Sequence, residues 1–166
     1  MKSLENASEK VGINFNGPYE FRDFRSYKGN ANAMERFEDV RFDVVPCKAM
    51  LEHDQYFWKS IAEIKRVAKP GGLVIIGLPG YKQFRIDRFK KRLEKVPGIR
   101  KLSNSRFFNL LFTGTVTFKV HSAPEDYYRF SPQALKKVFF EGMENDHVRS
   151  LMQPPRLIGI GTKKAA

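Results

Sequence analysis

The sequence predicts an α/β fold in which a mostly parallel sheet ends in an antiparallel pair of strands. Three observations support this prediction. An amphipathic helix lies between two short apolar runs, residues 42–45 and 73–76, which together form a strand–helix–strand unit. A Ser131-Pro132 step begins a second helix. Two strand-like segments, residues 147–152 and 156–162, then close the chain around a short proline-containing connection.

The size and charge of the chain indicate a single basic domain. Its 166 residues suffice for one hydrophobic core, and we expect one domain over residues 1–166 with a basic and aromatic insert at about 81–122. The formal net charge of +12 favours acidic partners such as nucleic acid or an anionic membrane surface. Cys47 is the only cysteine, so no intrachain disulfide can form. The single thiol and the absence of a secretory pattern in residues 1–10 favour a cytoplasmic location.

The N-terminal third is expected to contain three strands. Residues 11–15 form a short apolar run that ends at the turn signal Asn16-Gly17-Pro18. Residues 25–28 are compatible with a second short strand. The β-branched run at residues 42–45 is predicted to be a buried strand that ends at Pro46.

The clearest helix follows the third strand. The Asp54 carboxylate can accept hydrogen bonds from the first free amides of this helix. Apolar side chains recur at three- and four-residue spacing and give the helix one apolar face. They are Phe57, Trp58, Ile61, Ile64, Val67 and Ala68. Residues 69–72, which contain proline and glycine, end the helix. The apolar residues 73–76 predict a strand that is covered on both faces and runs parallel to the strand at 42–45.

The second half of the chain begins with the insert. Residues 81–102 are strongly basic and favour a helix over 83–95, and residues 107–118 are aromatic and apolar. Ser131 is predicted to cap a helix whose buried face contains Leu135, Val138 and Phe139. The two terminal strands are expected to be antiparallel because their connection is short.

Five blocks of the sequence carry a family resemblance. They are residues 29–34 (GNANAM), 37–45 (FEDVRFDVV), 50–54 (MLEHD), 63–76 (EIKRVAKPGGLVII) and 126–132 (DYYRFSP). Their order and spacing resemble those of class I S-adenosyl-L-methionine (SAM)-dependent methyltransferases, in the group called methyltransferase type 11. The resemblance covers about residues 11–163. It implies a Rossmann-like sheet and SAM-dependent methyl transfer.

The resemblance also implies a cofactor site across the C-terminal ends of the parallel strands. Asn14 lies in the region where the family has an acidic residue that accepts hydrogen bonds from the ribose hydroxyls. Asn30 and Ala31 match an Asp and a small residue that receive the adenine amino group, and the Asn carbonyl can still accept that hydrogen bond without a charge. The backbone positions that line the methionine moiety match Cys47, Lys48 and Ala49.

The glycine-rich turn that follows the first strand in this family has no counterpart here. It would precede Val11, where residues 1–10 contain no glycine and no strand pattern. The G-x-G at Gly159-Ile160-Gly161 leaves no room for a following helix and is interpreted as a terminal strand. The first strand and first helix are therefore expected to be absent, which would leave their neighbours without a pairing partner and open to association. An oligomer or a partner chain that completes the sheet is an expected consequence, and whether Met1 is the natural start stays open.

His53 and the segment before the last helix are the candidate acceptor site. His53 could contact the substrate or act as a general base, and the alternative is a helix-start residue with local contacts. His121, Asp126 and Tyr127 could form a substrate wall or a polar loop. The histidines and the single cysteine do not have metal-ligand spacing, so no metal site is expected.

The basic cluster at residues 85–101 leaves three interpretations open. It could contact nucleic acid phosphates, bind an anionic membrane, or form a solvated helix face followed by a lid over the substrate. The leading functional hypothesis is SAM-dependent methyl transfer to an unidentified small-molecule or lipid-like acceptor, by a chain that is either active or truncated and inactive. The alternatives are a non-catalytic α/β binding module and a basic binder of nucleic acid or membrane surfaces.

Overall fold

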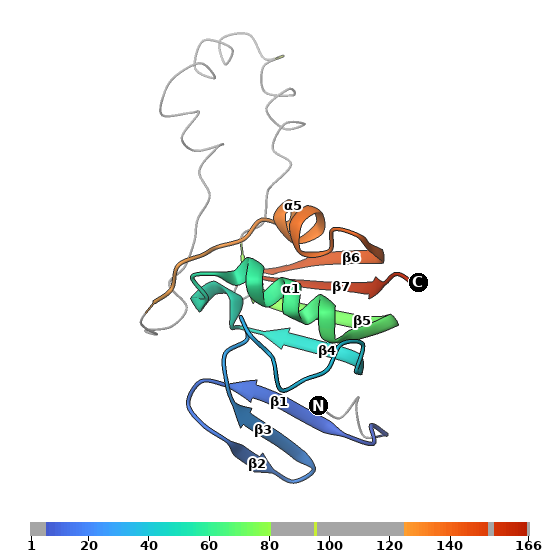
Figure 1. Cartoon of the computed structure of the whole chain (residues 1–166). Helices are drawn as coiled ribbons and strands as arrows, with labels where there is room; N and C mark the ends of the chain where they lie inside the picture. The colour runs from blue at the N-terminus through green and yellow to red at the C-terminus, as the bar shows by residue number, and fades with distance from the viewer. Residues whose placement is uncertain (1–5, 81–94, 96–124, 153–154, 166) are drawn as a thin grey trace.

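The computed structural model describes residues 6–80, 95, 125–152 and 155–165 of the chain (Figure 1). Within this part the strands form two sheets, and helices cover one face of the larger sheet. None of the helices described is long and apolar enough to cross a bilayer.

The smaller sheet has three strands in the order β1-β3-β2. β1 (Lys10–Asn14) and β3 (Phe24–Lys28) are the strands predicted at 11–15 and 25–28, and they pair in parallel. β2 (Tyr19–Phe21) pairs antiparallel with β3 and has no counterpart in the sequence prediction. All of its residues are exposed, so it carries no buried alternation by which a sequence could reveal it.

The larger sheet has the strand order β4-β5-β7-β6. β4 (Phe42–Lys48) and β5 (Ala68–Pro79) are parallel, as predicted for the strand–helix–strand unit. β6 (Met143–Met152) and β7 (Pro155–Lys163) form the predicted antiparallel pair, and β7 also pairs antiparallel with β5. The α/β class is confirmed, and the sheets are mixed, with two parallel and three antiparallel pairs among the strands described.

β4 continues through Pro46, so the prediction that the strand ends there is wrong. The amide of Ala49 donates to the carbonyl of Gly77 on β5 at 2.7 Å. Because successive residues of a parallel strand direct their backbone groups to alternate sides, Val45 and Cys47 face β5 and the nitrogen of Pro46 faces away from it. The proline therefore removes no hydrogen bond from the β4–β5 ladder, as expected for proline on an edge strand.

α1 (Phe57–Val67) lies on one face of the larger sheet and follows the short helix η2 (Leu51–His53). The Asp54 carboxylate stabilises its start, as predicted, by accepting hydrogen bonds from the Tyr56 amide at 2.9 Å and the Ser60 hydroxyl at 2.6 Å. Trp58 is 52% exposed, so its assignment to the apolar face is wrong. Its ring packs edge-on against neighbouring aromatic rings near the surface.

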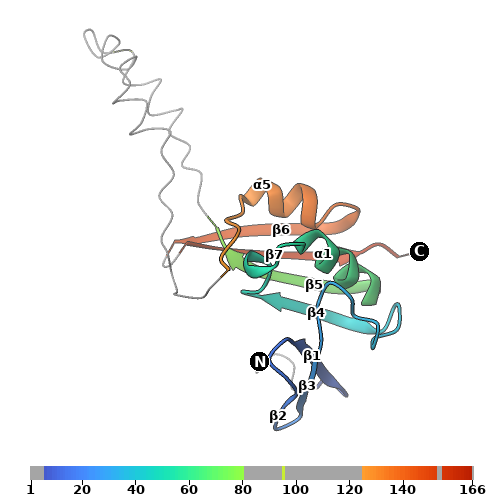
Figure 2. The same cartoon turned by 60° about the vertical axis from the view of Figure 1, so that its left-hand side comes forward.

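The second helical segment lies on the same face of the larger sheet (Figure 2). It begins with α5 (Pro132–Ala134), where the Ser131 hydroxyl accepts the predicted capping hydrogen bond from the Ala134 amide at 2.9 Å.

This segment continues as a π-helical turn, η3 (Leu135–Phe139). Leu135 and Phe139 are buried as predicted, but Val138 is 50% exposed. A π-helical turn contains more residues than the 3.6 on which the prediction of a buried face depends, and it rotates Val138 away from the core. Phe140 is buried in its place.

The hydrophobic core lies between these helices and the larger sheet. It contains Ile61, Ile64 and Val67 of α1, Leu135 and Phe139 of η3, and Val74, Ile76 and Leu78 of β5. The residues that alternate with them along β5, Leu73 and Ile75, are half-buried on the opposite face. No described helix covers that face, where Ile158 and Ile160 of β7 are each 38% exposed. The strand at 73–76 is therefore covered on one face only among the residues described.

β1 and β4 are edge strands of two separate sheets and do not pair with each other. β1 lies next to β4 in both views, and the two strands run in the same direction (Figures 1 and 2). An ion pair joins the segments before them, in which Arg41 donates to both carboxylate oxygens of Glu9 at 2.9 and 3.0 Å. Ring contacts of Phe37 with Tyr27 and Phe42 also connect the smaller sheet to the core.

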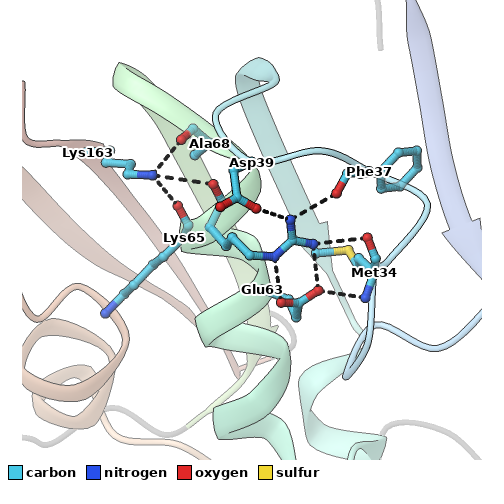
Figure 3. Close-up of polar contacts among 8 residues, drawn as sticks. Met34, Phe37, Asp39, Glu63, Lys65, Ala68 and Lys163 are labelled. Carbon is cyan, nitrogen blue, oxygen red and sulfur yellow. Dashed lines mark hydrogen bonds and ion pairs between the residues drawn. The ribbon is translucent and has the colours of Figure 1, made fainter.

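A network around Arg66 fastens the irregular segment before β4 to the end of α1 (Figure 3). Arg66 donates to the Glu63 carboxylate at 2.7 and 2.8 Å, to Asp39 at 2.6 Å and to the carbonyl of Phe37 at 2.9 Å. The Glu63 carboxylate also accepts a hydrogen bond from the Met34 amide at 2.6 Å. The hydrogen bonds from Arg66 hold the pKa of Glu63 below its ordinary value.

Lys163 stabilises the C-terminal end of α1. Its ammonium group donates to the carbonyls of Lys65 and Ala68 at 2.7 and 2.8 Å. Lys163→Met is expected to lower the free energy of unfolding by about 1–2 kcal/mol, because charged hydrogen bonds at a helix C-terminus are lost. Lys164→Met changes an exposed neighbour and should stay within about 0.5 kcal/mol of the wild type. Urea unfolding measures both variants, and equal midpoints would contradict this role for Lys163.

The Glu63–Arg66 pair predicts a pH dependence of stability. A carboxylate whose pKa is lowered by folding stabilises the protein above its ordinary value of 4.5, and this contribution is lost as the pH falls through the folded pKa. Glu63→Gln should therefore destabilise the chain by about 1–2 kcal/mol at neutral pH. The difference between variant and wild type should shrink as the pH falls below 4.5 in urea titrations. A constant difference across this range would rule out the charge of Glu63 as its source.

Candidate functional site

A cavity of about 350 Å³ opens at the C-terminal ends of β4 and β5, the edge at which open α/β sheets bind ligands. Its wall consists of residues 46–49, Glu52, Ile75, residues 77–79, Leu151 and residues 156–158. Of its wall, Pro46, Ile75 and Ile158 point to the face that no described helix covers, and Leu78 and Leu157 point to the helix-covered face. The wall is largely apolar, with Lys48, Glu52 and Arg156 as its charged members.

The backbone at the end of β4 reverses at Ala49, which has a φ of 51°. This left-handed conformation is strained for a residue with a Cβ atom and occurs where the surrounding structure enforces it. The hydrogen bond from the Ala49 amide to Gly77 holds the turn against β5. As a result Cys47, Lys48 and Ala49 lie together in the cavity wall. The family resemblance assigns the methionine moiety of SAM to these three positions, and that assignment stays a prediction.

Glu52 is a fully buried acidic residue in this wall. It follows the Ala49 turn within η2, and its backbone carbonyl accepts hydrogen bonds from the amides of Tyr127 and Tyr128 at 2.9 and 3.2 Å. A hydrogen-bonded ion pair with Asp126 raises the pKa of Arg129, and attraction to Glu52 adds to this shift. The carboxylate of Glu52 therefore lies near the Asp126–Arg129 ion pair, beside the cavity.

The structure brings together three of the predicted acceptor-site residues around Glu52. His53 has its Nδ1 atom 3.0 Å from the carbonyl of Glu125, and its Nε2 atom is 3.9 Å from the Glu52 carboxylate. Asp126 forms an ion pair with Arg129, and Tyr127 is exposed beside it. His53, Asp126 and Tyr127 adjoin the cavity wall without forming part of it. His121 lies outside the described residues.

The predicted adenosine-side residues lie at the ends of the smaller sheet. The Asn14 side-chain oxygen accepts a hydrogen bond from the Asn16 amide at 2.8 Å. The Asn30 side-chain oxygen accepts one from the Asn32 amide at 2.9 Å, and Ala31 is buried. None of Asn14, Asn30 and Ala31 lines the cavity, so the described residues separate the two halves of the predicted cofactor site.

Sequence reasoning missed the buried Glu52 and the wall that β5 and β7 supply. A carboxylate directly after the apolar Leu51, in the turn that follows a strand, is the one signal that could have singled out Glu52. Of the basic cluster at 85–101 only Lys95 is described, and it is exposed. Within the described part of the chain no group of three His, Cys, Asp or Glu side chains could hold a metal ion.

The Cys47 thiol is predicted to resist alkylation. Its removal from water, together with the negative charges of Glu52 and Asp54, raises the pKa to about 12. Iodoacetamide should therefore label the native chain at pH 8 far more slowly than the urea-unfolded chain, because the thiolate is the reactive form. Mass spectrometry over time measures both rates on this single cysteine. Comparable rates in the two states would show that the thiol is neither buried nor held neutral.

One family model matches the N-terminal part of the chain. The family model described as a methyltransferase domain (Methyltransf_11) matches residues 2–76. Among curated proteins none matches the sequence significantly.

Solved structures of similar fold include SAM-dependent methyltransferases. One from Thermotoga maritima has a TM-score of 0.58 and 19% identity, with 98% of this chain and 86% of that chain covered. One from Methanosarcina mazei has a TM-score of 0.55 and 18% identity, with 99% and 87% covered. A chain in the complex of the Haloferax volcanii Trm112 methyltransferase activator with a methyltransferase has a TM-score of 0.55 and 12% identity, with 98% and 76% covered.

These likenesses show a Rossmann-like fold over nearly the whole chain, and the family model covers residues 2–76 within it. The chain therefore has the fold of class I SAM-dependent methyltransferases, and residues 2–76 of its 166 match a methyltransferase domain model.

Proposed function

We propose that this chain transfers a methyl group from SAM to a small-molecule or lipid-like acceptor, with the methionine half of the cofactor in the cavity at the ends of β4 and β5. The observation that carries the proposal is the buried Glu52 carboxylate in the largely apolar cavity wall that also contains Cys47, Lys48 and Ala49. The family match supports the reaction class.

The residues of this wall fit one half of SAM. A buried carboxylate suits the positive sulfonium, which loses its hydration in an apolar cavity. Lys48 and Arg156 can pair with the carboxylate of the methionine moiety. The adenosine half has weaker support, because the exposed Asn14 offers an uncharged amide whose oxygen already accepts a hydrogen bond from Asn16.

Within this proposal the described residues orient the acceptor. SAM supplies an already activated methyl group when bound, so positioning contributes much of the rate. His53, whose Nδ1 atom is 3.0 Å from the carbonyl of Glu125, could receive a proton from the acceptor at its other ring nitrogen. Asp126 and Tyr127 belong to the segment packed on η2 and would line the acceptor side. This assignment of roles follows from their places around Glu52.

Completion of the site by a partner chain is part of the proposal. Within the described residues, Asn14, Asn30 and Ala31 lie apart from the cavity, and the edges of β1 and β4 are not paired with each other. The proposed cofactor site is therefore divided into two parts. One structure of similar fold was solved as a complex with a methyltransferase activator, which supports a partner chain as an arrangement open to this fold. The net charge of +12 on this chain favours a nucleic-acid or membrane partner. The basic cluster at residues 85–101 lies outside the described residues, apart from Lys95.

The cofactor proposal predicts a charge-selective effect of Glu52. Glu52→Gln should weaken SAM binding by about tenfold, equivalent to about 1.4 kcal/mol, because the sulfonium loses a negative neighbour. Binding of S-adenosylhomocysteine, whose sulfur is neutral, should change much less. Isothermal titration calorimetry measures both ligands, and Glu38→Gln, at an exposed position, is the matched control.

Two results would contradict the proposal. A folded chain with no binding of either ligand at millimolar concentration would not be a methyltransferase by itself. Equal weakening of both ligands in Glu52→Gln would show that the carboxylate supports the fold of the wall and does not attract the sulfonium.

A further inference from the structure

Two arginines on the β7 side of the cavity have no acidic partner among the residues that the structure describes. Arg156 lies in β7 and forms part of the cavity wall, and Arg149 lies on the neighbouring strand β6. Both are exposed, and within the described ranges no ion pair or hydrogen bond joins either to another side chain. In contrast, Arg25, Arg41 and Arg66 each form an ion pair with a carboxylate.

The strand register places these two arginines close to each other on one face. Arg149 pairs with Ile158, and Arg156 lies two residues before Ile158 on the same strand. Diagonal neighbours of this kind are about 7–8 Å apart, which is within reach of long side chains. Two positive charges in these positions repel each other, and an anion between them replaces the repulsion by two attractions. The pair is therefore suited to hold one anionic group.

The two arginines lie on the face of the larger sheet that no described helix covers. Leu157, between Arg156 and Ile158, is buried in the core on the opposite face. Arg156 and Ile158 therefore point away from the helices, and their partners Leu151 and Arg149 point the same way. Leu151 and Ile158 are 48% and 38% exposed beside the arginines. This surface therefore presents apolar groups next to two cations.

Gly77 connects this surface to the β4 side of the cavity. It is the register partner of Lys48 on β4 and of Ile158 on β7, so the three residues form one row across the sheet. All three line the cavity. A Cβ atom at Gly77 would lie 3.6 Å from the Lys48 side chain, so a larger side chain would fill the space between Lys48 and Ile158. The cavity therefore extends across β5 from Lys48 to Ile158.

We propose that the methyl acceptor is an amphipathic anion, with its acidic group between Arg149 and Arg156 and its apolar part against Leu151 and Ile158. Of the two cations that can pair with the methionine carboxylate, Lys48 is the one on the β4 side, so Arg156 remains for the acceptor. The identity of this ligand as the acceptor rests on the proposed function, whereas the anion site rests on the register and the two arginines alone.

The cavity favours a single small molecule over a membrane surface as the occupant. A bilayer presents a broad layer of headgroups, whereas Arg156 and Ile158 belong to the wall of a cavity of about 350 Å³. This volume lies in the range of small-ligand sites. Carboxylate and phosphate groups both match the planar fork of an arginine, so either suits the acidic end of the acceptor.

Calorimetric titration with amphiphiles of equal tail length tests the charge preference. Octanoate and octyl phosphate are the anionic probes, 1-octanol is the neutral probe and octyltrimethylammonium is the cationic probe. At neutral pH and low salt, at least one anionic probe should bind about tenfold more tightly than octanol, and the cationic probe should not bind. Equal binding of anionic and neutral probes, or no binding of either anion at millimolar concentration, would overturn the proposal.

Variants of the two arginines separate recognition from a structural role. Arg156→Gln should weaken binding of the anionic probe by about tenfold. The double variant Arg149→Glu and Arg156→Glu should lose that binding and bind octyltrimethylammonium instead. Lys137→Gln removes an exposed cation from η3 and is the matched control, with no expected change. Equal weakening in Arg156→Gln and Lys137→Gln, at unchanged urea midpoints, would overturn the proposal, because net charge alone would then attract the probe.

Vesicles of phosphatidylglycerol test the competing occupant. Sedimentation of the wild-type chain with vesicles, lost in Arg156→Gln and without binding of either soluble anion, would overturn the proposal in favour of a membrane surface.

Titration of SAM at saturating octanoate or octyl phosphate distinguishes this proposal from the proposed function. Simultaneous binding of SAM and the anion is the expected result and supports both. Binding of the anion without any binding of SAM retains the anion site and contradicts the proposed function. Binding of SAM that displaces the anion would overturn the present proposal alone, because the two ligands would then occupy the same part of the cavity.

Discussion

Strand β5 is the element on which the arrangement of the other parts depends. It pairs in parallel with β4 and antiparallel with β7, and its buried side chains Val74, Ile76 and Leu78 support both α1 and η3. The segment that follows η3 can approach the larger sheet closely only because β7, the strand next to β5, has glycine at two positions. A Cβ atom at Gly159 would lie 2.3 Å from the Phe140 ring, and one at Gly161 would lie 2.7 Å from it. The G-x-G of β7 thus admits an aromatic ring onto the sheet, which agrees with its interpretation as a terminal strand.

The one-sided helix layer determines where binding can occur. Because α1, α5 and η3 cover the same face, the apolar residues on the opposite face of β5 and β7 stay accessible among the residues described. The cavity lies at the edge where the backbone leaves β4 through the strained Ala49 turn, and Ile75 and Ile158 of that face form part of its wall. The β1–β4 edges adjoin the same region. Among the residues described, the cavity, the uncovered sheet face and the unpaired edges of β1 and β4 therefore lie on the same side of the molecule.

Electrostatics distinguish this side from the rest of a strongly basic protein. The whole chain has a net charge of +12, whereas the buried acidic side chain in the cavity wall is that of Glu52. The same negative environment, together with burial, keeps the Cys47 thiol protonated, with its pKa raised to about 12. A protonated thiol is a poor nucleophile, and a buried carboxylate favours a cationic ligand. This combination agrees with a sulfonium cofactor.

The sequence by itself determined the α/β class, the parallel β4–β5 pair, the terminal hairpin and the caps at Asp54 and Ser131, because local periodicity and turn chemistry decide these features. The family resemblance also singled out Cys47, Lys48 and Ala49, which the structure brings together in one cavity wall. Only the tertiary structure decided that Trp58 and Val138 are exposed, since a π-helical turn and a surface aromatic cluster alter the helical periodicity. Only the tertiary structure decided that β4 passes through Pro46 on a free edge, and that Glu52 turns inward while Asn14 and Asn30 lie apart from the cavity. Strand order and burial depend on contacts between segments far apart in the chain, and no local pattern of residues records them.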